Sequence, residues 1–279
     1  MLIGLFFISG CCFSQVTGKA ANVRTINFYV VNKPKTFDLF SRTVIWRARR
    51  KARRHNNFLR LIVSGSLPEI YQKIAACLMK ENAQIGTLWF DTHGHYSNGY
   101  SSFLIGRMEF NYRTIRDTSY TKILEKIAEF CGPHSNIVIG SCYGGATFER
   151  KDYNGNSLGN MKGDSLMIGL ARVFKNSMVY GTESWVMTKP GIFQKQRYAL
   201  AGYPLQRRFK DEIYRPVWER MGVWHRFSTR SSVFETINTV SLTRLGDLII
   251  KGESYLEHPK YQQKLARNRK KLRPGLAKL

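Results

Sequence analysis

IGTLWFDTHGH, residues 85–95, is the stretch that decides the fold, because it joins an apolar strand to a cluster of polar side chains. Its first six residues form a nearly continuous apolar run, which is typical of a strand buried on both faces. Its last five residues contain an aspartate and two histidines, with a glycine between the histidines. In open α/β sheets, functional groups gather beyond the carboxyl ends of strands, so this stretch predicts a functional site.

Similar strand-like segments occur on both sides of this stretch. Residues 23–31 and 59–63 are rich in β-branched, aliphatic and aromatic side chains, which favour strands. Residues 136–141 (NIVIGS) and 177–181 (SMVYG) have the same character. We therefore expect at least five strands in the first two thirds of the chain.

Segments with helical periodicity separate these strands. Residues 41–55 carry apolar side chains at the spacing of one helix face, opposite a basic face. Pro68 opens a second helix, because proline is tolerated in a first helical turn. Residues 120–130 form a third helix, and Asp164 is expected to cap a fourth. This alternation predicts an α/β fold with a mainly parallel sheet covered on both faces.

The rest of the chain completes the predicted organisation. Residues 101–110 (SSFLIGRMEF) predict a hairpin, and residues 234–250 can add strands. We assign residues 21–189 to one α/β domain. Residues 190–279 are aromatic-rich and basic, and we expect them to form a C-terminal extension packed on that domain.

A second polar cluster, CYGG at residues 142–145, follows the strand at residues 136–141. His93 and Cys142 would project from the same edge of the sheet if their two strands are neighbours. Either residue alone is usually structural, but together they suffice for catalysis. A cysteine thiolate is a nucleophile, and an imidazole can take the thiol proton and protonate a leaving amine. We expect an oxyanion site between the N–H groups of Gly94 and Cys142.

In these motifs the chain resembles the clan CD cysteine peptidases, which include caspases, legumain, gingipains and clostripain. Both motifs follow an apolar strand: His-Gly at residues 93–94, then a small residue, Cys, any residue and Gly at residues 141–144. The spacing agrees, because caspases place the histidine about 50 residues before the cysteine and here the separation is 49 residues. Ser141 departs from the pattern, since these families often have alanine there.

The resemblance covers residues 23–184 and implies a caspase-like three-layer sandwich that hydrolyses peptide bonds. It implies Cys142 as the nucleophile and His93 as the general acid and base, with no cofactor. The expected protein is thus a bacterial, caspase-like cysteine endopeptidase with a protein or peptide substrate. Glu183 follows the strand after the cysteine, where some relatives resembling clostripain keep an acidic residue that binds a basic substrate side chain. The alternative for Glu183 is a solvated residue at the end of a strand.

A metal site is the chemical alternative for the first cluster. Asp91, His93 and His95 also resemble the metal-binding opening of amidohydrolases, whose ligands alternate along a strand. That interpretation needs an eight-fold βα barrel and further ligands, for which the remaining chain is short. The later histidines are His134, His225 and His258.

Charge suggests a function of another class. The chain has 44 Lys and Arg residues against 19 Asp and Glu residues, a formal net charge of +25. Residues 42–54 contain seven basic side chains and residues 260–279 contain eight, with no acidic residue in either run. Such a surface attracts polyanions and anionic membranes. The alternative is therefore a non-catalytic protein that binds polyanions or the cell envelope, although solvated helix faces would also explain these runs.

Residues 1–20 have the features of an export or lipoprotein signal. Their apolar stretch LIGLFFISG is too short to span a bilayer but suits the core of a signal peptide. The sequence ISGC resembles a bacterial lipobox, which would place a lipid on Cys11, whereas small residues before Gln15 or Ala20 would accept ordinary cleavage. The domain is thus expected to be exported: periplasmic, membrane-anchored as a lipoprotein, or secreted. The two cysteines beyond this segment and the site, Cys77 and Cys131, fall on predicted helical faces as packing residues.

Overall fold

A computed structural model gives the structure of the chain in separate segments. It describes residues 23–32, 59–94, 100–151, 156–175, 177–184, 186–188, 197–201, 223–238, 240–242 and 248–250. Several predicted features lie outside these residues: the segment 1–20 with Cys11, the helix over residues 41–55 with its basic run, His95, and the basic run at residues 260–279. No helix in the described segments is both long enough and apolar enough to cross a bilayer.

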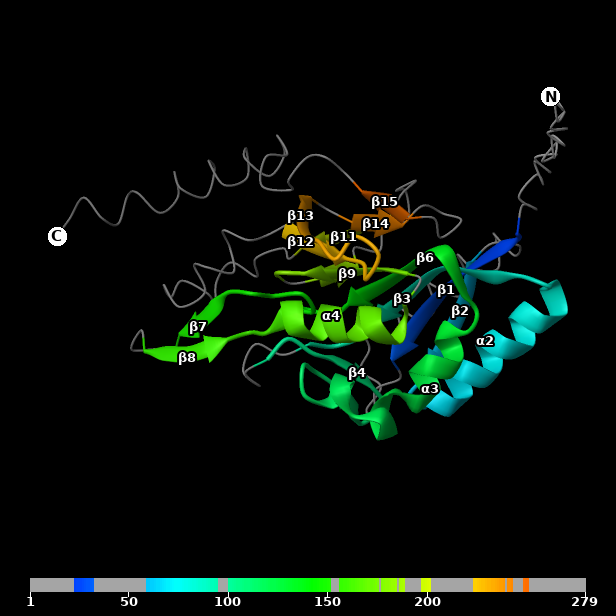
Figure 1. The fold of residues 1–279 in the computed structure, drawn as a ribbon, viewed down its shortest axis with the longest axis horizontal. Coiled ribbons are helices and arrows are strands. Elements are labelled where there is room, and N and C mark those ends of the chain that lie inside the picture. Colours follow the sequence, from blue (N-terminus) through cyan, green and yellow to red (C-terminus); the bar gives the residue numbers. More distant parts are fainter. Residues whose placement is uncertain are drawn as a thin grey trace, which may run out of the picture.

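Seven strands form the central sheet. In chain order they are β1 (Thr25–Asn32), β2 (Leu59–Ser64), β3 (Gln84–Asp91), β6 (Cys131–Gly140), β9 (Met178–Thr182), β12 (Val223–Phe227) and β13 (Phe234–Asn238). Across the sheet their order is β13-β12-β9-β6-β3-β1-β2 (Figure 1). The strands from β2 to β9 are parallel to their neighbours, and β12 and β13 add an antiparallel edge. The predicted α/β fold with a mainly parallel sheet is confirmed.

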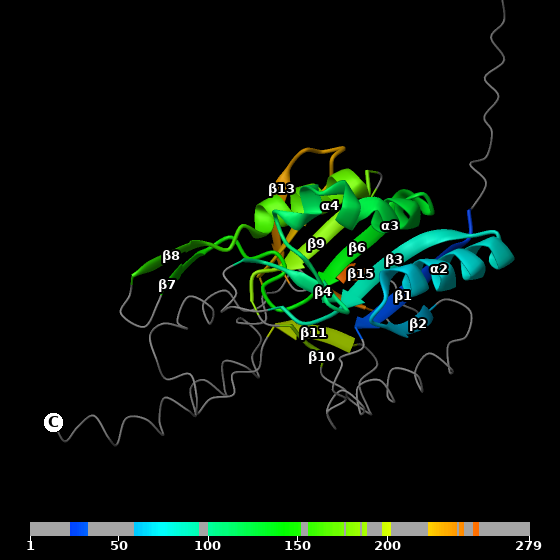
Figure 2. The same ribbon diagram turned by 90° about the horizontal axis from the view of Figure 1, so that it is seen from below.

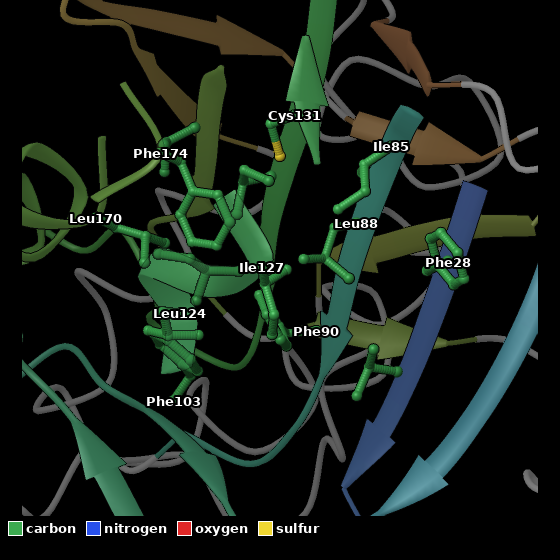
Figure 3. Close-up of a cluster of buried hydrophobic side chains, with 14 of the residues drawn as sticks. Phe28, Ile85, Leu88, Phe90, Phe103, Leu124, Ile127, Cys131, Leu170 and Phe174 are labelled. Carbon is green, nitrogen blue, oxygen red and sulfur yellow. The ribbon is translucent and has the colours of Figure 1, made fainter. Parts of the chain in front are cut away.

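Three helices cover one face of this sheet: α2 (Leu67–Glu81), α3 (Thr118–Ala128) and α4 (Gly163–Val173) (Figures 1 and 2). A hydrophobic core fills the space between these helices and the sheet (Figure 3). Phe28 of β1, Leu88 of β3, Ile127 of α3 and Leu170 of α4 are all buried in it. Burial of these apolar side chains is the main free energy that fixes the helices on the sheet.

The opposite face of the central sheet carries a second, smaller sheet (Figures 1 and 2). Its strands are β10 (Val186–Thr188), β11 (Arg197–Ala201), β14 (Val240–Leu242) and β15 (Leu248–Ile250), in the order β10-β11-β14-β15. Val240 and Leu248 pack against a cluster that includes Trp89 and Trp224 of the central sheet. In the described segments, helices therefore cover one face of the central sheet, and strands pack on the other.

The remaining strands form two hairpins. The first, β4 (Phe103–Ile105) with β5 (Met108–Phe110), confirms the hairpin predicted at residues 101–110. The second, β7 (Glu149–Lys151) with β8 (Ser157–Asn160), projects from the body of the molecule beside α4 (Figures 1 and 2). This projecting hairpin lies in the chain between Cys142 and α4.

One helix start differs from the prediction. Lys162, not Asp164, is the N-cap residue of α4, and its backbone is left-handed with φ 59°. Asp164 lies in the first turn instead. A carboxylate there still stabilises the helix, because the first turn carries the positive end of the helix dipole. The helix predicted from Asp164 onward is therefore confirmed, but the prediction that Asp164 is its N-cap residue is wrong.

The region after residue 189 contributes directly to the central sheet. β12 pairs with β9, and β13 pairs with β12. Trp224 of β12 is fully buried, and its ring lies 6.0 Å from that of Trp89 on β3. The strands predicted at residues 234–250 are confirmed by β13, β14 and β15.

Candidate active site

Two neighbouring strands bring the candidate catalytic residues to one edge of the sheet. β3 and β6 are parallel and adjacent, and their last residues, Asp91 and Gly140, are direct partners. His93 and Cys142 each follow the end of their strand by two residues. The condition that these two strands are neighbours is met, and both loops therefore leave the sheet at its carboxyl edge.

The two loops are in contact at Gly94. A Cβ atom at this position would overlap the backbone carbonyl oxygen of Cys142 and would lie 3.1 Å from that of Ser102. A residue with a side chain would therefore force the loops apart, so glycine permits the close approach. The contact places the backbone beside His93 directly against the backbone of Cys142.

Both candidate catalytic residues are accessible. His93 is exposed, and Cys142 is half-buried. The Cys142 side chain packs on a small buried cluster made of Tyr143, Ala146, Phe148 and Met161. Partial exposure of this kind is typical of reactive cysteines, which must reach a substrate while their position stays fixed.

The chain turns sharply after Cys142. Tyr143 has φ 60°, in the left-handed region that residues with side chains seldom adopt. The N–H of Gly144 donates to the carbonyl of Ser141, 3.2 Å away, and the N–H of Ala146 donates to the carbonyl of Tyr143, 3.1 Å away. These bonds close two successive turns. Strained turns of this kind are often found at functional sites, where they present one side chain in a fixed direction.

Two serine hydroxyls link this turn to the segment after His93. The Ser141 hydroxyl donates to the carbonyl of Ser102 at 2.8 Å, and the Ser101 hydroxyl donates to the carbonyl of Ala146 at 2.9 Å. Both serines are fully buried. Ser141, the departure from the family pattern, is thus a small residue whose hydroxyl ties the cysteine loop to the histidine side of the site.

Glu183 is buried rather than solvated. Its side chain is 3% exposed, and its Oε1 accepts a hydrogen bond from the Thr147 hydroxyl. The same oxygen lies 2.8 Å from Nε2 of His225 on β12, a contact that is not aligned as a linear hydrogen bond. The solvated alternative for Glu183 is therefore wrong. Nothing in the sequence marked His225 or Thr147, because strand pairing brings His225 to this carboxylate from 42 residues away along the chain.

The other residues of the first cluster have different surroundings. The Asp91 carboxylate accepts a hydrogen bond of 2.5 Å from the hydroxyl of Tyr29 on β1. His95, the third ligand of the metal alternative, lies outside the described segments. Within those segments, no three His, Cys, Asp or Glu side chains gather closely enough to hold a metal ion.

The two remaining described cysteines have packing roles. Cys77 of α2 packs at the margin of the main core. Cys131 is the first residue of β6, so its predicted position on a helix is wrong: α3 ends at Ala128, and the strand starts three residues later. Its side chain enters the core shown in Figure 3. Burial raises the pKa of the Cys131 thiol to about 11, although the neighbouring hydroxyl groups of Ser177 and Ser135 act to lower it.

No protein-family model and no curated protein matches this chain.

Proposed function

We propose that this protein is a cysteine endopeptidase with a caspase-like fold, in which Cys142 is the nucleophile and His93 is the general acid and base. The observation that carries the proposal is the contact of the Gly94 backbone with the Cys142 backbone at the carboxyl edge of β3 and β6. It supports a common site for two residues that lie 49 positions apart in the sequence. The mainly parallel sheet, with its antiparallel edge at β12, is compatible with a caspase-like sandwich.

The proposed reaction has two stages. His93 accepts the thiol proton, and the Cys142 thiolate attacks the carbonyl carbon of the scissile peptide bond. The N–H groups of Gly94 and Cys142 stabilise the oxyanion that forms. When the C–N bond breaks, His93 gives its proton to the leaving amine, and the acyl group stays on sulfur. His93 then takes a proton from water, which attacks the thioester, and the acid product leaves as the thiol is restored.

The surroundings of the site favour this role for His93 over metal binding. Asp91, which would share the metal, is engaged by the Tyr29 hydroxyl. His93 is exposed and follows β3 at the same edge of the sheet as Cys142. It precedes Gly94, the residue whose backbone contacts the backbone of Cys142. A base that serves both a thiol and a leaving amine must lie near the nucleophile and be accessible to the substrate.

The substrate is proposed to be a protein or peptide outside the cytoplasm, because residues 1–20 have the character of an export segment. The lipid on Cys11 remains part of this proposal, with cleavage before Gln15 or Ala20 as its alternative. The net charge of +25 supports a second candidate function, binding of a polyanion or of an anionic membrane surface. The two functions are compatible, since the basic runs at residues 42–54 and 260–279 lie apart in the sequence from the candidate dyad.

A peptide-hydrolysis assay tests the proposal. Wild type, Cys142→Ala and the matched control Cys77→Ala are incubated with a mixture of unfolded peptides, and new termini are identified by mass spectrometry. We expect cleavage by wild type and by the control, and none by Cys142→Ala. Cleavage by Cys142→Ala that a chelator stops and zinc restores would overturn the cysteine mechanism in favour of a metal hydrolase.

A further inference from the structure

We propose that Glu183 and His225 are positioning residues that orient the nucleophile loop, residues 141–148, through the hydroxyl of Thr147. The inference rests on the proposed function, because it assigns the network a part in the work of Cys142. It also gives Glu183 a role different from substrate binding, the role that the family resemblance implies. The nucleophile loop is bonded to the end of β9 and the two residues that follow it.

Alternate residues of the nucleophile loop bond to three consecutive residues at that end. The N–H of Tyr143 donates to the carbonyl of Ser184 at 2.8 Å, and the N–H of Gly145 donates to the carbonyl of Thr182 at 2.9 Å. The next alternate residue, Thr147, donates its hydroxyl to the Glu183 carboxylate. The series therefore continues from the backbone into a side chain, and Glu183 holds the far end of the loop.

Both the backbone and the carboxylate of Glu183 contact β12. The backbone N–H of Glu183 donates to the carbonyl of Val223 on β12, 3.0 Å away. His225, two residues along β12, places its Nε2 2.8 Å from the carboxylate oxygen. A buried carboxyl group is costly without such partners, so the imidazole and the Thr147 hydroxyl together allow it to stay inside the protein.

The imidazole is fixed from its other side. Nδ1 of His225 lies 3.2 Å from the hydroxyl oxygen of Thr236 on β13. The imidazole also packs on the ring of Phe234, with 4.8 Å between the two ring centroids. The His225 side chain is 6% exposed. Contacts on both ring nitrogens and on the ring face leave it little freedom to turn. A chain of contacts thus runs from β13 and β12 through Glu183 to the loop that carries Cys142.

This arrangement separates the two roles of Glu183 experimentally. A substrate-binding carboxylate would act on peptides with a lysine or arginine before the scissile bond, and its loss would raise KM for those peptides alone. A positioning carboxylate acts on every substrate alike, because a misplaced thiol slows the reaction whatever the peptide sequence. Small displacements of a reacting group can lower a rate by about 100-fold.

The experiment compares Thr147→Val, which removes the hydroxyl at nearly constant volume, with Thr147→Ser, which keeps it. The first readout is the rate at which iodoacetamide alkylates Cys142 relative to Cys77 in the same molecule, measured by peptide mass spectrometry at pH 6.5. The second is kcat and KM for two peptides that wild type cleaves, one with arginine and one with a neutral residue before the scissile bond. Thermal unfolding is followed in parallel, and Glu183→Gln serves as a second variant if Thr147→Val does not fold.

We expect Thr147→Val to lower both the Cys142-to-Cys77 alkylation ratio and kcat by about tenfold, with KM nearly unchanged for both peptides. Thr147→Ser should stay close to wild type, and Glu183→Gln should lie between the two. Lower thermal stability with an unchanged alkylation ratio and kcat would overturn the proposal, since the network would then be structural only. A selective rise in KM for the arginine peptide in Glu183→Gln would overturn it in favour of substrate binding. Alkylation of Cys142 needs no peptidase activity. If wild type cleaves no peptide but Thr147→Val still has a lower alkylation ratio than wild type, the positioning role stands and the peptidase function is refuted.

Discussion

A cysteine lies at or near each end of strand β6, and the two cysteines differ in burial and in their surroundings. Cys131 is the first residue of the strand, buried in the main core, and burial raises the pKa of its thiol to about 11. Cys142 follows the last residue by two positions, is half-buried, and lies on a tight turn beside the backbone of Gly94. The amino end of the strand suits a packing residue, whereas the carboxyl end is partly exposed and lies against the loop that contains His93.

The comparison shows that position in the sheet, not residue type, decides what a cysteine can do here. At the amino end, β6 follows α3 closely, so the helix and the core close over Cys131. At the carboxyl end, the loops after β3 and β6 emerge side by side, and neither is followed at once by a helix. Reactive groups of parallel sheets gather at this edge for the same reason.

The largest effect is expected when each of the two cysteines is replaced in turn by alanine. We expect Cys142→Ala to abolish peptide hydrolysis and labelling by thiol-directed peptide inhibitors, because the nucleophile is gone. Cys131→Ala should retain activity and lose about 1 kcal/mol of unfolding free energy, the cost of a small cavity. Activity assays and denaturant titrations measure both. Equal loss of labelling in the two variants would remove the distinction between the ends of β6.

The next largest effect concerns the two histidines of the first polar cluster, His93 and His95. We expect His93→Ala to lower kcat by about 10²- to 10⁴-fold, the usual contribution of a general acid and base. His95→Ala should keep a substantial fraction of activity, because the imidazole of His95 is not required for proton transfer. Steady-state kinetics with and without a chelator measure this. Comparable damage in both variants, with activity that zinc restores, would favour the metal alternative.

A smaller effect is expected from the contact between the loops. Gly94→Ala adds a methyl group that would overlap the Cys142 carbonyl oxygen. The loops must then separate, and we expect kcat to fall by about 10- to 100-fold. Gly159→Ala is the control for kcat. Nothing lies within 4 Å of its added methyl group, and the backbone strain that alanine meets at its φ of 81° falls on the projecting hairpin. If kcat is unchanged in Gly94→Ala, the contact does not set the geometry of the dyad.

The smallest effect is the pH dependence of stability at the buried end of β6. The pKa of the Cys131 thiol is raised from 9.0 to about 11 in the folded protein. Above pH 9 the unfolded thiol ionises while the folded thiol stays protonated, so this group's stabilising contribution falls as pH rises toward 11. At pH 10 the loss is about 1.4 kcal/mol. Urea titrations at pH 8 and pH 10 should therefore show a steeper decline for wild type than for Cys131→Ala, and parallel declines would contradict the assignment.

The sequence allowed the sheet and the two site loops to be predicted, because both depend on local patterns. The apolar run before Asp91 and the run before Ser141 specify buried strands, and their polar ends specify the edge at which function gathers. The antiparallel position of β12 was not predictable in this way, since it depends on pairing with β9. The environment of Glu183 was missed for the same reason: its burial is produced by His225, which only the folded sheet brings near.

Errors at single residues have a similar origin. Asp164 has the side chain of a helix cap, but the left-handed backbone at Lys162 starts the helix before it. Cys131 follows a helical pattern closely enough to be mistaken for part of it, although the chain is already extended there. Local propensity identifies these elements, whereas their exact boundaries depend on packing.

The most direct test of the central claim is the rate of Cys142 alkylation by iodoacetamide as a function of pH, in wild type and in His93→Ala. If His93 and Cys142 form an acid–base pair, the imidazolium stabilises the thiolate, and wild type should react rapidly well below pH 8. The His93→Ala variant should then react only as pH approaches about 8.5, the ordinary pKa of a cysteine thiol. The same pH profile in both proteins would show that His93 does not act on Cys142, and the assignment of the dyad would be wrong.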